Sequence, residues 1–211
     1  MRSKVSRRKL LQSTGAAFLL TQAELLVEAS ESQSTAAESS SFASVVKRRA
    51  MIRAYKNDPV PEEVIQRLLE YAVRAPSAGN LQPWEFVVVQ DPEVRAQLAS
   101  AAFEQTSVAT APVIIATCAD IQRMGKKYGT RGSFYSLVDT SFASLLILLG
   151  VVEQGLGACF VGAYDPVEVA KILGLPEHVR PVGLITIGYP AERSSNPPNK
   201  KIVLQKLVHR N

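Results

Sequence analysis

The chain has 211 residues, of which 46% are hydrophobic and 20% are charged, an ordinary balance for a globular protein. Its net charge is +5, but residues 1–29 hold five basic groups and two acids, which leaves about +2 for the rest. No basic stripe interleaved with aromatic residues is present, so nucleic acid is not an expected partner. Cys118 and Cys159 lie far apart, and the two histidines have no metal-ligand spacing. Neither a disulfide framework nor a metal site is therefore expected.

Residues 1–41 have the composition of a targeting segment. Ser6–Leu11 (SRRKLL) resembles the twin-arginine export signature of bacteria. The apolar run that follows is too short and too polar for a membrane span. Residues 1–29 are predicted to be a signal peptide, which implies a periplasmic or cell-envelope location, and the Ser/Ala/Glu-rich residues 30–41 a disordered linker. The alternative is a basic, disordered tail on a cytoplasmic protein.

Residues 42–211 are long enough for one domain with a sizeable core. Apolar residues at helical spacing predict helices over residues 42–50, 61–75, 92–103, 134–154 and 165–173. Continuous apolar runs predict strands over residues 86–89, 111–118, 155–163 and 181–187.

Three of the remaining features bear on assembly and mobility. Residues 122–133 are polar and contain glycine, and are predicted to form a mobile loop. The apolar segment 134–154 is predicted to be a core helix, which a dimer interface would also bury, rather than a membrane span. In the polar tail, residues 202–204 offer a short strand for the edge of a partner's sheet.

The connection before strand 86–89 is the stretch best suited to a ligand. Pro76 ends the preceding helix, and Ser77, Gly79 and Asn80 follow it in a polar loop rich in accessible backbone. An amide that both donates and accepts is suited to a flat heterocycle with amide edges. An ordinary helix-to-strand connection explains the same pattern.

Two further stretches could bind a ligand. Four basic side chains fall within residues 47–53, and guanidinium groups such as those of Arg49 and Arg53 suit phosphate. A solvated, charged turn is the alternative. Gly162 and Ala163 bring bare backbone to the surface after a strand, where N–H groups can approach a ligand.

Together these stretches identify a family. The chain resembles the FMN-dependent nitroreductase family over nearly all of residues 47–211. The resemblance rests on RAMIRAY (49–55), PVPEEVIQRLLEYAVRAPSAGNLQPWEFVVV (59–89), GLGACFVGAYD (155–165) and LGLPEHVRPVGLITIGYP (173–190). It implies an α+β fold, with a mixed sheet flanked by helices, and a homodimer that binds FMN at its interface.

The resemblance also implies which residues bind FMN. These are Arg49, Ala50, Met51, Arg53, Ser77, Asn80, Asp139, Phe160, Gly162, Ala163, Lys200 and Lys201. Arg49 and the two lysines match phosphate-binding positions, and Arg53 matches a cation at the flavin pyrimidine edge. The loop and Asp139 match positions that touch the ring, and Phe160 to Ala163 match the segment beside the reactive N5. Ala50 and Met51 depart from the family, which often has a basic group and a hydroxyl there. This departure bears on FMN affinity more than on FMN identity, and Arg48, Lys200 and Lys201 could compensate for it.

The implied activity is a two-electron transfer. A hydride passes from NAD(P)H, or another donor, through flavin N5 to a nitroaromatic, a quinone or an activated C=C bond, with no catalytic side chain. The alternatives are a relative that dehydrogenates or dehalogenates, a flavin-binding module without turnover, and a member that has lost its cofactor. Export conflicts with a cytoplasmic nicotinamide donor, so either the signal is not functional or the donor is another molecule.

Overall fold

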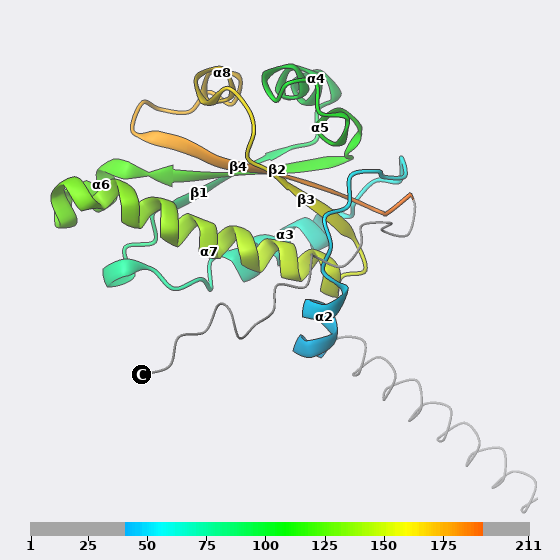
Figure 1. Cartoon of the computed structure of the whole chain (residues 1–211), viewed down its shortest axis with the longest axis horizontal. Helices are drawn as coiled ribbons and strands as arrows, with labels where there is room; N and C mark the ends of the chain where they lie inside the picture. The colour runs from blue at the N-terminus through cyan, green and yellow to red at the C-terminus, as the bar shows by residue number, and fades with distance from the viewer. Residues whose placement is uncertain (1–40, 192–211) are drawn as a thin grey trace, which may run out of the picture. The chain divides into compact units, whose positions relative to one another are not determined.

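The computed structural model describes residues 41–191 (Figure 1). The predicted signal peptide, nearly all of the predicted linker, and the tail with Lys200, Lys201 and the predicted strand 202–204 lie outside the described residues. The chain divides into two compact units, residues 1–47 and 48–211. Helix α2 (Phe42–Arg48) belongs to the first unit up to Lys47, and Arg48 and all later described elements belong to the second.

The second unit is built on a four-stranded sheet. Its strands are β1 (Trp84–Val89), β2 (Val113–Asp120), β3 (Gly157–Val161) and β4 (Val179–Gly188). They pair in the order β1-β2-β4-β3, and every neighbouring pair is antiparallel. Parallel pairing, which a mixed sheet implies, is limited in the described part to one bridge between Met51 and Ala158.

Helices cover both faces of this sheet (Figure 1). On one face lie α4 (Pro92–Ala101), α5 (Thr106–Thr110) and α8 (Pro166–Ile172). On the other face lie α3 (Glu62–Ala72) and the long α7 (Gly132–Glu153). Each face buries its own apolar cluster, so the sheet is covered on both sides. The α+β class is confirmed, and each helix and strand predicted within residues 41–191 is present with ends shifted by a few residues.

The prediction of a mobile loop over residues 122–133 is wrong. The chain there forms α6 (Ile121–Tyr128) and a 3-10 turn, η2 (Gly129–Arg131), that folds back onto α7. Asp120 caps α6, and Met124 on its inner face is fully buried. A Cβ at Gly132 would lie 2.5 Å from the backbone nitrogen of Gly125, so the missing side chain of Gly132 allows α6 to pack closely against the start of α7.

Helix α7 is a core helix. By length and composition alone, the helical segment Ile121–Glu153 could cross a membrane, but 56% of its most apolar 18-residue window is buried within the protein. One of its buried hydroxyls also bonds to the sheet, since Ser144 Oγ donates to Thr117 Oγ1 at 3.0 Å. Burial of this kind is expected of a helix that packs on a sheet.

Candidate functional site

The loop between α3 and β1 has an unusual backbone. It contains a 3-10 turn, η1 (Ala78–Asn80), and three residues with positive φ: Gly79 at 59°, Asn80 at 57° and Gln82 at 50°. Non-glycine residues adopt this left-handed conformation rarely and at a cost, and such residues cluster at binding sites. Two bonds hold it: Asn80 N donates to Ser77 O at 3.0 Å, and Gln82 N donates to Ser77 Oγ at 3.0 Å.

This geometry leaves hydrogen-bond donors available on the two predicted polar residues. Ser77 Oγ accepts from Gln82 N, so its own O–H can still donate. Asn80 Oδ1 accepts from Gln82 Nε2 at 3.2 Å, which leaves the Asn80 amide N–H groups for another partner. Ser77 is half-buried and Asn80 is exposed, so a ligand can reach both. The loop therefore offers donors to the carbonyl and nitrogen acceptors of a heterocycle.

Asp139 supports this loop from α7. Its Oδ2 accepts from Ala78 N at 2.9 Å, and the residue is only 3% exposed. Burial raises the pKa of the Asp139 carboxyl, and the Ala78 N–H acts in the opposite direction. The structure thus places Asp139 behind the loop that carries Ser77 and Asn80 and gives it an anchoring contact to the loop backbone; its contact with the flavin ring stays a prediction.

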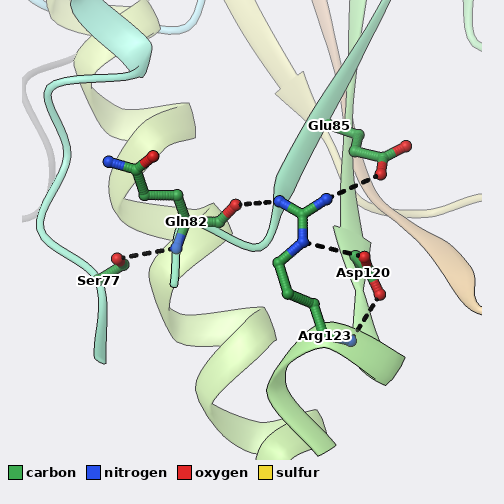
Figure 2. A network of polar contacts seen from close by, with 5 residues as sticks. All are labelled: Ser77, Gln82, Glu85, Asp120 and Arg123. Carbon is green, nitrogen blue, oxygen red and sulfur yellow. Dashed lines mark hydrogen bonds and ion pairs between the residues drawn. The ribbon is translucent and has the colours of Figure 1, made fainter. Parts of the chain in front are cut away.

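A second support comes from Arg123 on α6 (Figure 2). Its Nη1 donates to Gln82 O at 2.6 Å, and its Nε donates to Asp120 Oδ2 at 3.1 Å. Its Nη2 lies 3.6 Å from Glu85 Oε1. Asp120 also caps α6, because its Oδ1 accepts from Arg123 N at 2.8 Å. One guanidinium therefore joins the end of the loop, the start of α6 and strand β1.

Sequence reasoning missed Arg123. A signal was present, since an aspartate at the end of an apolar strand followed three residues later by arginine is a capping pattern that also allows an ion pair. Arg123 lies within residues 122–133, which the sequence predicts to be a loop, so no helix start is expected at Asp120.

The second group of predicted residues lies at the outer edge of β3. The strap of residues 49–53 runs along this strand: Ile52 N donates to Ala158 O at 2.8 Å, and Phe160 N donates to Met51 Sδ at 3.5 Å. Arg53 lies beside Cys159, where burial raises the pKa of the thiol and the guanidinium opposes that rise.

The end of β3 is open at the surface. Gly162 and Ala163 are exposed, and Gln105 Nε2 donates to Ala163 O at 2.8 Å, which fixes the turn that follows the strand. The Phe160 ring packs on Gly183 of β4, where a Cβ would collide with it. The strap and residues 160–163 are therefore neighbours in the fold.

A hollow of about 680 Å³ adjoins the strap. Among the described residues, its lining includes two cations, Arg48 and Lys56, together with Ala50, Gly155 and Gly157, but no carboxylate. Anions are favoured in such surroundings. A second hollow, of about 650 Å³, lies between α4 and α8 and is lined by none of the predicted site residues.

The two groups lie at opposite edges of the sheet. The loop of residues 77–82 leads into β1, whereas residues 49–53 and 160–163 flank β3. Three strand spacings separate these edges, a distance of about 14 Å. Within residues 41–191, no three His, Cys, Asp or Glu side chains are grouped so that they could hold a metal ion.

Comparison with known proteins identifies the family. A profile described as "Nitroreductase family" matches residues 46–110 and 103–189. The chain belongs to the nitroreductase family. The NADH dehydrogenase of Thermus thermophilus is 36% identical to this family member over 189 residues, which cover 76% of this chain and 91% of that protein.

Two other relatives extend the comparison. The FMN reductase (NAD(P)H) of Bacillus subtilis is 30% identical over 161 residues, which cover 70% of this chain and 65% of that protein. The crystal structure of the nitroreductase family protein from Streptococcus pneumoniae matches with a TM-score of 0.73 at 26% sequence identity. That match covers 81% of this chain and 100% of the other. This nitroreductase-family chain is accordingly an oxidoreductase, and the nitroreductase-like fold is confirmed.

Proposed function

We propose that the chain binds FMN and transfers two electrons, as a hydride, from NAD(P)H to a flat electrophilic acceptor such as a nitroaromatic or a quinone. The observation that carries this proposal is the loop of residues 77–82. Its backbone is left-handed, and Gln82 donates to both Ser77 Oγ and Asn80 Oδ1. The Ser77 hydroxyl and the Asn80 amide therefore keep donors for a heterocycle. The names of the relatives, an NADH dehydrogenase and an FMN reductase, support the donor and the cofactor.

The described residues fit FMN at both ends of that molecule. Gly162 is exposed without a side chain, so bare backbone is accessible at the β3 edge, and on the β1 side of the proposed ring site the donors of Ser77 and Asn80 remain available. At the phosphate end, the sulfur of Met51 is engaged by Phe160 N and offers no donor to an anion. Arg48 and Lys56, which line the neighbouring hollow, supply the positive charge that Ala50 and Met51 do not.

When bound, FMN supplies a hydride-accepting and hydride-donating N5, which is the chemistry of the reaction. The chain's own residues would bind the cofactor and orient it. Ser77 and Asn80 donate to the heterocycle edge, and Asp139 and Arg123 fix the backbone that carries them. Arg53 places a cation at the β3 edge, where negative charge that develops on a reduced ring would be stabilised.

We further propose that FMN binds between two copies of the chain. The two groups of binding residues lie about 14 Å apart at opposite edges of one sheet. A two-fold symmetric dimer can bring the β1 edge of one copy to the β3 edge of the other. Helix α7 supports this arrangement, because four large apolar side chains on one of its faces are exposed. They are Phe134 (59%), Leu137 (50%), Phe142 (44%) and Leu145 (46%).

The test is a spectrum followed by a titration. The purified full chain is expected to show visible flavin absorption, or to gain it on addition of FMN, and the absorption should bleach when NADPH or NADH is added anaerobically. Asn80→Leu should weaken FMN binding about tenfold, since it removes a hydrogen-bond donor to the edge of a polar heterocycle. A colourless protein that takes up no FMN would contradict the proposal, and bound flavin that neither nicotinamide reduces would contradict the donor.

A further inference from the structure

Two cation–aromatic pairs lie side by side where α6 meets α7. Lys127 Nζ lies 5.5 Å from the centroid of the Tyr128 ring, and Arg131 Cζ lies 5.1 Å from the centroid of the Tyr135 ring. The two tyrosine rings are 5.0 Å apart and meet edge to face at 68°. These four residues, named here the α6–α7 cluster, combine positive charge with aromatic surface.

The cluster borders the loop that we propose holds the flavin. A Cβ at Gly79 would collide with Lys127 Nζ and would lie 2.6 Å from the hydroxyl of Tyr128. Both polar ends therefore rest directly on the loop backbone between Ser77 and Asn80, in space that the missing glycine side chain leaves open. Any molecule stacked on a heterocycle held by this loop would lie beside the cluster.

No carboxylate within residues 41–191 neutralises the charge of the cluster. Neither Lys127 nor Arg131 lies within ion-pair distance of a carboxylate of residues 41–191, and both are exposed. Arg123, the other arginine of this region, differs, because Asp120 and Glu85 pair with it. Two unpaired cations beside aromatic faces are complementary to an aromatic ring that carries negative charge.

We propose that the α6–α7 cluster selects, as electron acceptors, flat aromatic molecules that carry an anionic substituent such as a carboxylate. This inference rests on the proposed function and names the substrate class of that same site. For a nitroarene acceptor, the two electrons and one proton come from a hydride, and a second proton comes from solvent. The nitro group becomes a nitroso group, and one oxygen leaves as water.

The test compares two acceptors of the same size, 4-nitrobenzoate and its neutral analogue 4-nitrobenzamide. The FMN-loaded full chain is reduced with dithionite in the absence of oxygen, which makes the measurement independent of the natural donor. Each acceptor is then mixed in, and the second-order rate constant is taken from the return of flavin absorption. The ratio of the two rate constants within one variant cancels the intrinsic reactivity of the acceptors.

Lys127→Gln and Arg131→Gln are each expected to lower this benzoate-to-benzamide ratio about fivefold, the upper range for an exposed ion pair. Raising the salt concentration should lower the wild-type ratio in the same direction. Lys126→Gln is the matched control: it removes the same charge one residue earlier on α6, about 100° around the helix, and should leave the ratio unchanged.

Two results would overturn the inference. An equal fall of the ratio in Lys126→Gln would show a general effect of charge. Slower reaction with both acceptors in Lys127→Gln, together with weaker FMN binding, would assign the lysine to the cofactor. Failure of the chain to bind FMN at all would be visible before any acceptor is added, and would count against the proposed function itself.

Discussion

At the scale of single residues, the candidate site depends on backbone conformation as much as on side chains. Gly79 has φ of 59°, and the space where its side chain would be is filled by the ends of Lys127 and Tyr128. Gly125 is also a glycine of this region, but it lies inside helix α6 with no atom within 4 Å of a built Cβ. The two positions should therefore respond to the same substitution in opposite directions.

Gly79→Ala is expected to lower the free energy of unfolding by about 1–2 kcal/mol, because alanine is strained at positive φ. Gly125→Ala is expected to raise it by about 0.5–1 kcal/mol, because alanine is the better residue inside a helix. Urea unfolding of the full chain, followed by circular dichroism, measures both. Destabilisation by both substitutions would mean that α6 does not have the regular backbone described here.

The residue types of the site could be predicted from the sequence, but their contacts could not. Ser77 and Asn80 stand out because hydroxyl and amide side chains follow a helix-ending proline. The contact between Asp139 and Ala78 N joins residues 61 positions apart, which no local pattern specifies. Lys200 and Lys201 remain predictions.

At the scale of elements, α6 decides how the loop of residues 77–82 is held. Strands β2 and β4 could be predicted because their apolar runs are continuous. Helix α6 could not, because its eight residues contain one fully buried anchor, Met124, among polar residues and a glycine. Its stability comes from the Asp120 cap and from packing on α7, which become visible only in the fold. The polar contacts of Arg123 then couple α6 to the loop (Figure 2).

Arg123→Ala is expected to raise the dissociation constant of FMN about tenfold, because Gln82 O loses a charge-assisted hydrogen bond worth about 1.5 kcal/mol. Arg123→Lys keeps the positive charge but should restore only part of the affinity, since an ammonium can bond to fewer of the three acceptors at once. Fluorescence titration with FMN measures this, and Lys126→Ala serves as the control on the same helix. A lower melting temperature without any change in FMN affinity would show that Arg123 only stabilises the fold.

At the scale of the whole molecule, the strand order explains why one chain offers two incomplete halves of a site. Order β1-β2-β4-β3 puts the loop of residues 77–82 and the strap of residues 49–53 at opposite edges. Sequence patterns identify strands but do not give their order in a sheet, so this separation could not be predicted from apolar runs. The exposed apolar face on α7 likewise requires the fold, because the sequence of this helix is apolar on nearly all sides.

Leu145→Asp is expected to turn a dimer into a monomer and to abolish FMN binding together with it. A carboxylate in an apolar interface costs at least about 3 kcal/mol, which is about a hundredfold in the dimer dissociation constant. Light scattering after size-exclusion chromatography gives the mass, and FMN titration of the same fractions gives the affinity. Val167→Asp is the matched control, because Val167 is 72% exposed on α8, across the sheet from α7, and should change neither quantity. A monomeric Leu145→Asp variant that still binds FMN tightly would show that one chain completes the site by itself.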